Sequence, residues 1–259
     1  MKPPPFDYVR PETLEEALAE LGRGGEDAKP LAGGQSLVPL LNMRLARPSL
    51  LVDLNRVAGL DAVTRENGSV RIGATVRQAG MPDLPLVREA LPHVGHVATR
   101  NRGTVGGSVA HADPSAELAV ALVALGGTVV VESRASRRAI GAADFFTGTF
   151  ETALEPGELL VETVWPVHEG GCAFEELSLR HGDYALAMCA VVAEGDGLRV
   201  ALGSVVDRPL LVECPPDPEE AAEAAAAAAD PVETIHATAE YRRHATRVLV
   251  RRATERALA

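Results

Sequence analysis

The chain has 259 residues, of which 46% are hydrophobic and 24% charged, proportions that are ordinary for a soluble globular protein. Its length fits one large domain or two smaller ones. The formal net charge is −11, and aromatic residues make up only 3%, with a single tryptophan, Trp165. An acidic surface repels a phosphate backbone, so this composition disfavours nucleic acid as a partner.

The cysteines and the first residues exclude further classes. Cys172, Cys189 and Cys214 are far apart and form no C-x-x-C pair, which argues against a zinc knuckle, an iron–sulfur cluster and a disulfide framework. A small, odd number of cysteines favours a reducing compartment. Residues 1–7 carry no apolar signal segment, and no stretch approaches the roughly 20 apolar residues of a membrane helix. We therefore expect a cytoplasmic protein without a membrane span.

The first fifty-odd residues predict a small α/β unit. Thr13 and Glu16 form a capping box at the start of a helix whose apolar residues recur at helical spacing, and Gly22 is the expected stop. Ser36 can cap a second helix, with Pro39 in its first turn, where a missing N–H costs little. The remaining expected elements are a strand over 29–32, the second helix to about residue 46, and a buried strand over 50–54.

The rest of the chain alternates short strands with turns and ends in helices. Gly195-Asp196-Gly197 is a strong hairpin signal, and the strand before it is almost wholly apolar, which predicts that both of its faces are covered. The expected elements are strands over 70–73, 128–131, 159–164, 185–193 and 198–205, helices over about 115–125 and 219–229, a linker over 166–171, and a final helix from about Thr238.

The final helix carries an apolar stripe flanked by arginines. The stripe consists of Tyr241, Ala245, Val248, Leu249 and Ala253, and the flanking residues are Arg242, Arg243, Arg247, Arg251 and Arg252. One interpretation is a solvated face whose aliphatic stems lie on the core. The other is a docking surface for a partner, because this basic helix belongs to an acidic protein.

Two glycine-rich segments carry the chemistry. Ala32-Gly33-Gly34-Gln35-Ser36 joins a predicted strand to a predicted helix, and Thr104-Val105-Gly106-Gly107-Ser108 lies further along the chain. Glycines let the backbone approach a ligand, and N–H groups at the start of a helix attract an anion such as a pyrophosphate. Each segment alone is equally typical of a tight turn. Two of them together suggest one long ligand with two ends, such as a dinucleotide.

Other nucleotide and catalytic signatures are absent. The first strand is not followed by G-x-G-x-x-G, and no G-x-x-x-x-G-K-[ST] occurs, so a Rossmann NAD domain and a P-loop ATPase are both disfavoured. His93 and His96 are separated by a helix-breaking glycine and have no third ligand, and His111 with Asp113 is more typical of local hydrogen bonding. No G-x-S-x-G elbow occurs. We expect neither a metal site nor a catalytic nucleophile.

At these two segments the sequence resembles the FAD-binding medium subunit of the carbon monoxide dehydrogenase and xanthine dehydrogenase family. The 32–36 segment resembles the family's first pyrophosphate motif, and the 104–108 segment resembles its second. Further matches in order are residues 6–10, Leu51-Val52-Asp53-Leu54, Asp183-Tyr184-Ala185 and the segment 239–244. The match covers nearly the whole chain, and two spaced motifs are more specific than either one.

The resemblance implies a set of FAD-binding residues. The residues from Lys29 through Leu31, Ala32, Gly33, Gly34 and Gln35 to Ser36 would wrap the pyrophosphate from one side, and Thr104, Val105, Gly106, Gly107 and Ser108 would close it from the other. His111, Asp113 and Glu117 would contact the ribityl chain, where Glu117 can equally complement a helix dipole. Leu160 would pack on the adenine. Tyr184 would lie near the isoalloxazine ring, its alternative being a hydrogen-bonded core tyrosine.

The sequence departs from the family pattern at three places. Ser108 stands where many members have asparagine, Glu117 where they have aspartate, and Glu175-Glu176 where many have a lysine near the flavin. Losing that cation would make reduction to an anionic flavin less favourable. The acceptor of the electrons, whether quinone, NAD or oxygen, is left open by the sequence, as is the substrate of the complex.

The resemblance also implies the architecture and the assembly. The expected fold is α+β, with a two-part FAD-binding domain over 1–168 (a small α/β subdomain over about 1–55 and a mixed or antiparallel sheet over 56–168), followed by a C-terminal antiparallel sheet with helices over 169–259. The chain would carry electrons from [2Fe–2S] clusters of a small subunit to an external acceptor, beside a large molybdopterin subunit, in a dimer of heterotrimers. No catalytic acid or base is expected here. The alternatives are a stand-alone flavin oxidase or reductase, and a scaffold module that has lost FAD.

Overall fold

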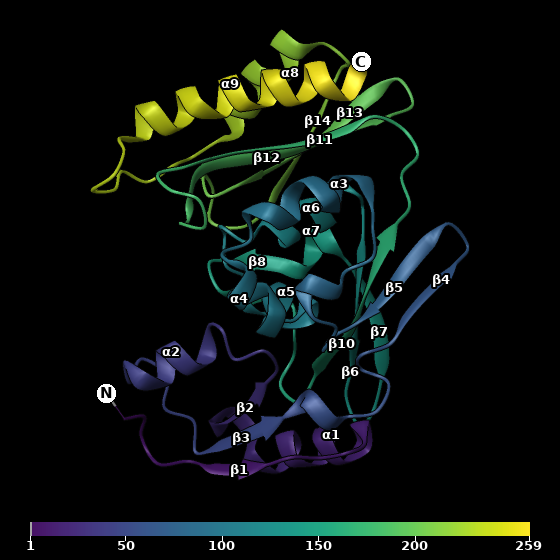
Figure 1. The fold of residues 1–259 in the computed structure, drawn as a ribbon, viewed down its shortest axis with the longest axis vertical. Helices are drawn as coiled ribbons and strands as arrows, with labels where there is room; N and C mark the ends of the chain where they lie inside the picture. The colour runs from purple at the N-terminus through teal and green to yellow at the C-terminus, as the bar shows by residue number, and fades with distance from the viewer. Residues whose placement is uncertain (1) are drawn as a thin grey trace.

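Three β-sheets follow one another along the long axis of the molecule, each accompanied by helices (Figure 1). The structure is a computed structural model and describes residues 2–259. The first sheet is parallel and the other two large sheets are antiparallel. This arrangement confirms the predicted α+β class.

The first sheet has the order β1-β3-β2 and packs on one helix. The strands are β1 (Asp7–Val9), β2 (Ala28–Leu31) and β3 (Leu50–Asp53), and the helices are α1 (Leu14–Gly24) and α2 (Leu37–Asn42), with 3-10 turns η1 (Gly25–Asp27) and η2 (Leu54–Arg56). The capping box of α1 is confirmed, since Thr13 Oγ1 accepts from Glu16 N at 3.2 Å. The predicted stop at Gly22 is wrong. The helix ends instead before Gly25, whose φ of 57° is suited to glycine.

The second helix is shorter than predicted, and Ser36 does not cap it. Ser36 already has helical backbone angles, and its side chain accepts no capping hydrogen bond. Helix α2 ends at Asn42, because Arg44 takes a φ of 61° that no α-helix continues. The helix therefore ends about four residues before the expected end near residue 46.

The middle sheet has the order β4-β5-β10-β6-β7 and carries several short helices on its flank. Its strands are β4 (Val63–Glu66), β5 (Ser69–Gly73), β6 (Thr128–Glu132), β7 (Arg137–Gly141) and β10 (Leu159–Pro166), with a small pair, β8 (Phe146–Gly148) and β9 (Glu151–Thr152). The helices are η3 (Gln78–Gly80), α3 (Pro85–Ala90), η4 (Leu91–His93), α4 (Val97–Arg102), α5 (Val105–His111), α6 (Glu117–Ala124) and α7 (Ala142–Phe145). From Leu118 to Ala124, every residue of α6 is fully buried.

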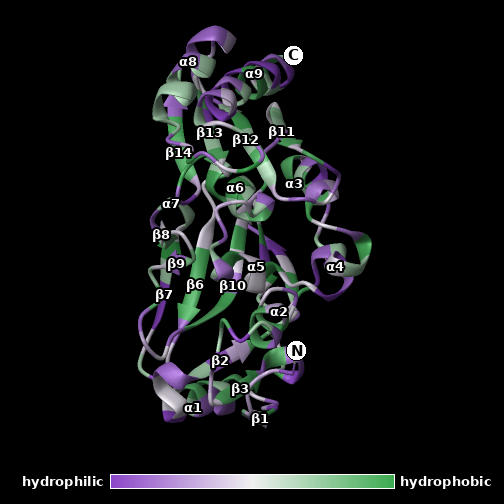
Figure 2. Cartoon of the chain, turned by 90° about the vertical axis from the view of Figure 1, so that its left-hand side faces the viewer, coloured by the Kyte–Doolittle hydropathy of each residue, from purple (hydrophilic) through white to green (hydrophobic). Residues whose placement is uncertain are grey.

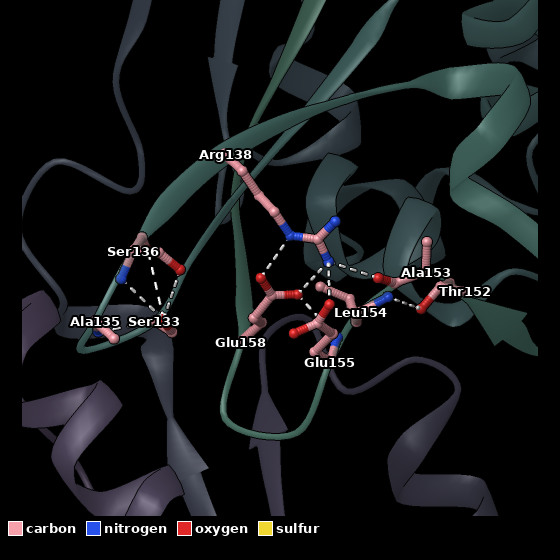
Figure 3. A network of polar contacts seen from close by, with 9 residues as sticks. All are labelled: Ser133, Ala135, Ser136, Arg138, Thr152, Ala153, Leu154, Glu155 and Glu158. Atoms are coloured by element: carbon pink, nitrogen blue, oxygen red, sulfur yellow. Dashed lines mark hydrogen bonds and ion pairs between the residues drawn. The ribbon is translucent and has the colours of Figure 1, made fainter.

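A polar network ties the segment before β10 to the neighbouring hairpin (Figure 3). The guanidinium of Arg138 on β7 donates to both carboxylate oxygens of Glu158 at 2.7 Å, and to the carbonyl oxygen of Ala153 at 2.8 Å. Glu158 also accepts from the backbone N–H of Glu155 at 2.8 Å. The Arg138 guanidinium holds the pKa of Glu158 below its usual value. This network fixes where β10 begins, and therefore where Leu160 stands opposite Val131.

The third sheet is covered on both faces. Its strands are β11 (Cys172–Ser178), β12 (Ala185–Glu194), β13 (Gly197–Gly203) and β14 (Leu210–Cys214), and the helices α8 (Pro218–Ala228) and α9 (Ala239–Leu258) lie on its outer face. Helix α6 packs on the inner face, so the middle and third sheets share one hydrophobic core. Strands of this shared core, such as β6 and β13, are hydrophobic in colour, whereas the edge strand β7 is hydrophilic (Figure 2). The prediction that β12 is buried on both faces is confirmed, as is the hairpin, in which Glu194 pairs with Gly197.

The arginines of α9 make contacts that the sequence did not predict. Tyr241, placed in the apolar stripe, is 49% exposed, whereas Arg242 is only 7% exposed. Arg242 donates to the carbonyl oxygens of Leu186 at 2.9 Å and Val232 at 2.6 Å, and to that of Ser204. Arg247 pairs with Glu223 of α8 at 2.6 Å. Ala245, Leu249 and Ala253 are buried as predicted, but Arg242 takes the place expected for Tyr241. Its guanidinium reaches carbonyl groups on β12 and in two loops beneath α9.

Candidate cofactor site

The first glycine motif forms an open loop between β2 and α2. Gly34 has a φ of 72°, which is suited to a residue without a side chain. Within residues 2–259, no protein acceptor receives a hydrogen bond from the backbone N–H groups of Gly33, Gly34, Gln35 or Ser36. All four residues are at least partly exposed. The loop therefore presents a row of free donors, which suits an anionic ligand.

The second glycine motif is helical, and its N–H groups are occupied. Thr104 is the N-cap of α5, and its Oγ1 accepts from Gly107 N at 3.1 Å. The N–H groups of Val105 and Gly106 donate to the carbonyl oxygens of Val76 and Ala74, and that of Ser108 donates to Thr104 O. The expectation that this segment offers free backbone donors is therefore wrong. The reason is that the helix starts at the motif itself, and the preceding strand region supplies its acceptors.

The two motifs meet through their glycines. A Cβ atom on Gly33 would lie 2.4 Å from the carbonyl oxygen of Arg102 and 2.8 Å from Cα of Gly103. A Cβ on Gly107 would lie 3.3 Å from Cβ of Ala32. Segments distant in the sequence are thus in backbone contact, so one ligand can reach both. The sequence predicted this convergence from motif content, and the structure confirms that the motifs meet.

A polar network fixes the first loop against the second. Asn55 donates from Nδ2 to the carbonyl oxygen of Ala32 at 2.8 Å, and its backbone N–H donates to Asp53 Oδ1 at 2.9 Å. Arg77 donates to Asn55 Oδ1 at 2.6 Å and to the carbonyl oxygen of Arg102. Arg77 therefore bridges the two motifs. Sequence reasoning missed Asn55 and Arg77, although the position of Asn55 just after the buried strand β3 was an available signal.

The residues expected to contact the ribityl chain lie between the end of α5 and the start of α6. His111 ends α5, and its ring lies 5.0 Å from that of Phe150. Burial lowers the pKa of His111 against the opposing charge of Asp113, so the imidazole is neutral near neutral pH. Tyr184 precedes β12 and is 74% exposed. Partial desolvation and the nearby Asp113 carboxylate raise the pKa of Tyr184.

Glu117 is the most perturbed carboxyl group at this end. Burial raises the pKa of Glu117 to about 7, with further increases from the charges of Glu176 and Asp113. It stands in the first turn of α6, where a helix dipole favours a carboxylate. Burial outweighs that effect. Glu117 is therefore largely protonated at slightly acidic pH.

The raised pKa of Glu117 predicts how stability depends on pH. The folded chain binds this proton more tightly than the unfolded chain, so the carboxyl group costs stability as the pH rises from its unfolded value near 4.5 through about 7. Glu117→Gln should stabilise the chain by up to about 3 kcal/mol at pH 8 and change little at pH 5. Urea unfolding followed by the fluorescence of buried Trp165 measures this. An equal effect at both pH values would contradict the assignment.

The remaining residues expected to contact FAD differ in their exposure. Lys29 is exposed on β2, next to the first loop, while the side chain of Val105 is fully buried. Leu160 is 3% exposed and belongs to the central core, which leaves little of its surface for an adenine. Of the two glutamates that replace the expected lysine, only Glu176 faces the Glu117 side, because successive side chains of β11 point to opposite faces of the sheet. Glu175 pairs with Arg256 of α9 at 2.8 Å.

Among residues 2–259, no group of three or more histidine, cysteine, aspartate and glutamate residues could hold a metal ion. No helix there has the length and apolarity needed to cross a membrane. The geometry is that of a site for an anionic, elongated organic ligand.

Comparison with known proteins gives the class. Residues 4–168 match the family described as "FAD binding domain in molybdopterin dehydrogenase". The chain is 41% identical to the 6-hydroxypseudooxynicotine dehydrogenase complex subunit alpha of Paenarthrobacter nicotinovorans, covering 100% of this chain and 96% of that protein. It is 35% identical to the carbon monoxide dehydrogenase medium chain of Hydrogenophaga pseudoflava, covering 98% and 97%. The chain therefore belongs to this family of FAD-binding subunits of oxidoreductases.

Solved structures agree with the assignment. A chain of reconstituted CO dehydrogenase from Oligotropha carboxidovorans matches with a TM-score of 0.93 and 34% identity, covering 99% of each chain. A chain of quinoline 2-oxidoreductase from Pseudomonas putida 86 matches with a TM-score of 0.91 and 36% identity, covering 99% and 98%. The predicted family, fold and FAD cofactor are confirmed. The protein is an FAD-binding medium subunit of a molybdenum hydroxylase of the carbon monoxide dehydrogenase type, with an electron-transfer role.

Proposed function

We propose that FAD lies along the contact between the two glycine motifs. The observation that carries this proposal is the backbone contact at Gly33, beside four free N–H donors of the first loop. Those donors would hold the pyrophosphate, with Lys29 adding positive charge. Ser108 and the backbone of 104–107 would contact it from the other side. His111, Asp113 and Glu117 would bind the ribityl hydroxyl groups, and Tyr184 would lie by the isoalloxazine ring.

The remaining expected contact, Leu160, is retained as part of the proposal for the adenine end, although its burial limits the contact area. The domain division proposed is 1–168 for FAD binding, with subdomains 1–55 and 56–168, and 169–259 for the C-terminal part. The family match over residues 4–168 supports the boundary.

We infer that the chain works within a complex. When bound, the flavin would accept electrons from [2Fe–2S] clusters of a small subunit and pass them to an external acceptor, while a large molybdopterin subunit oxidises the substrate. Relatives named as a complex subunit or medium chain support this arrangement. The proposed assembly is a cytoplasmic dimer of heterotrimers. The stand-alone oxidase and the FAD-free scaffold are disfavoured, because relatives such as caffeine dehydrogenase subunit beta and nicotine 6-hydroxylase medium subunit are named as subunits and the glycine loop is intact.

The experiment is purification of the tagged chain from its host, with subunit, metal and flavin analysis. We expect two further subunits, molybdenum, iron and one FAD for each copy of the chain. Anaerobic addition of the substrate of the complex should bleach the flavin absorbance. A chain that purifies alone and oxidises a substrate alone would contradict the proposal.

A further inference from the structure

Three ionisable side chains, one of them buried and two partly exposed, come from three different elements where the middle sheet's helices meet the third sheet. His93 ends η4, Glu117 starts α6, and Glu176 lies on β11. His93 Nδ1 is 3.6 Å from Glu176 Oε1, and the ring of His93 packs against that of Phe174 at 5.5 Å. Helix α6, which Glu117 starts, packs against η4, which His93 ends, and α6 also packs against α3, which lies on β11. This packing brings the three side chains to one place, and the charges of Glu176 and His93 act on Glu117 there.

Glu176 carries a buried carboxyl group, one oxygen atom of which has no hydrogen-bond partner. Its side chain is 1% exposed, and its Oε2 atom is buried without a hydrogen-bond partner. A buried carboxylate oxygen without a donor is costly, and it is commonly relieved by a proton or a water molecule. The adjacent Glu175 points to the other face and pairs with Arg256. The burial of Glu176 is thus a property of its face of the strand.

The charges around the cluster are unbalanced. Within residues 2–259, no lysine or arginine forms an ion pair with Glu117 or Glu176, and His93 is the single imidazole in contact with them. Asp113 and Tyr184 face Glu117 from the adjoining loops, and Glu175 acts on His93 from β11. On α3, Glu89 is already paired with Arg256 at 2.7 Å. From β12, which packs beside β11, no ionisable side chain faces the cluster within the described residues.

Two buried carboxyl groups and one imidazole cannot all be ionised cheaply. Contact with Glu176 raises the pKa of His93, and burial raises that of Glu117 to about 7. The most favourable state near neutral pH therefore keeps one more proton than isolated groups would hold. Negative charge added nearby increases the affinity for protons further.

We propose that His93, Glu117 and Glu176 form a proton-holding cluster beside the flavin end of the cofactor site. The cluster takes up a proton from water when electrons bring negative charge to that end, and it releases the proton to water when the electrons leave. Glu117 connects the cluster to the site, because it starts α6 directly after the turn in which the N–H of Ala116 donates to the carbonyl oxygen of Asp113 at 3.0 Å. No bond other than O–H or N–H forms or breaks in this exchange. The inference rests on the proposed placement of the flavin near Tyr184.

The cluster can be tested first without cofactor. A two-dimensional NMR titration of ring nitrogens in the full chain should give His93 a midpoint above the ordinary histidine value. Glu176→Gln should lower that midpoint, because the contact that raises it is lost. Glu175→Gln, the matched change on the same strand but the opposite face, should lower it much less, because Glu175 acts on His93 only through its charge and is the weakest of the contributions that raise this pKa. Equal midpoints in wild type and Glu176→Gln would overturn the cluster.

The redox role is tested on the FAD-loaded full chain by spectroelectrochemistry from pH 6 to 9. In wild type, the midpoint potential of the flavin should depend on pH with a break where the cluster titrates. Glu176→Gln should favour reduction about tenfold at pH 8 and move the break, and Glu117→Gln should also move it. Glu175→Gln should behave as wild type. An FAD-loaded chain whose pH profile is unchanged by both cluster variants would overturn this inference alone. A chain that binds no FAD would overturn the proposed function and the redox role with it, and the NMR titration would still report on the cluster.

Discussion

Gly33→Ala is expected to weaken FAD binding by at least about tenfold and up to about a hundredfold. The new methyl group would stand 2.4 Å from the carbonyl oxygen of Arg102 and 2.8 Å from Cα of Gly103. Both are backbone atoms, so no side chain can rotate away, and the two motifs must separate. Since the ligand spans both motifs, a shift of either one misplaces the donors. Titration of FAD into the purified chain, followed by flavin fluorescence, measures the change.

Gly22→Ala is the matched control for this experiment. Gly22 lies within α1, and a Cβ there would meet no atom within 4 Å. Alanine is favoured over glycine inside a helix, so the control should leave FAD affinity unchanged and raise stability by about 0.5–1 kcal/mol. If Gly33→Ala bound FAD as tightly as Gly22→Ala, the contact between the motifs would not be part of the site.

Arg242→Met is expected to lower the free energy of unfolding by about 2–4 kcal/mol. Methionine fills the volume of the stem but cannot donate to the carbonyl oxygens of Leu186, Val232 and Ser204. Ser204 has a φ of 65°, and its backbone N–H donates to Pro114 O at 2.8 Å while its hydroxyl meets that of Ser115 at 3.0 Å. The loss should therefore loosen the loop that carries Asp113. Urea unfolding with Trp165 fluorescence gives the stability, and FAD titration gives the effect on the site.

Arg252→Met provides the comparison on the same helix. Arg252 is exposed, so the same substitution should change stability by less than about 0.5 kcal/mol. Similar losses in the two variants would mean that general charge on α9, and not the bonds of Arg242, holds the loops beneath it.

Local sequence signals predicted the parts of the fold that local interactions determine. The capping box of Thr13, the apolar strand β12 and the turn at Gly195 and Asp196 each carry their structure in a few adjacent residues. Strand β4 was missed because all four of its residues are exposed, so it shows no apolar pattern. Strand β1 was missed as well, and it is only three residues long.

The sequence predicted which motifs form the candidate site, but it did not predict their hydrogen-bond partners. The glycines of both motifs indicated close backbone approach, and the structure places them in contact. The acceptors of Val105 and Gly106 could not be foreseen, because Val76 and Ala74 come from a separate segment. Asn55 and Arg77 were missed, and Arg242 was placed outside the buried stripe, for the same reason, since their partners are backbone carbonyl groups or distant side chains. Residue type alone does not reveal such partners.

The most direct test of the central claim is the flavin stoichiometry of the isolated chain. Purified protein should be incubated with excess FAD, separated from free FAD by gel filtration, and examined by visible absorbance. The account predicts one tightly bound FAD for each chain, retained by Gly22→Ala and greatly reduced in Gly33→Ala. A wild-type chain that stays colourless after this treatment, or a Gly33→Ala chain that retains FAD equally well, would contradict it.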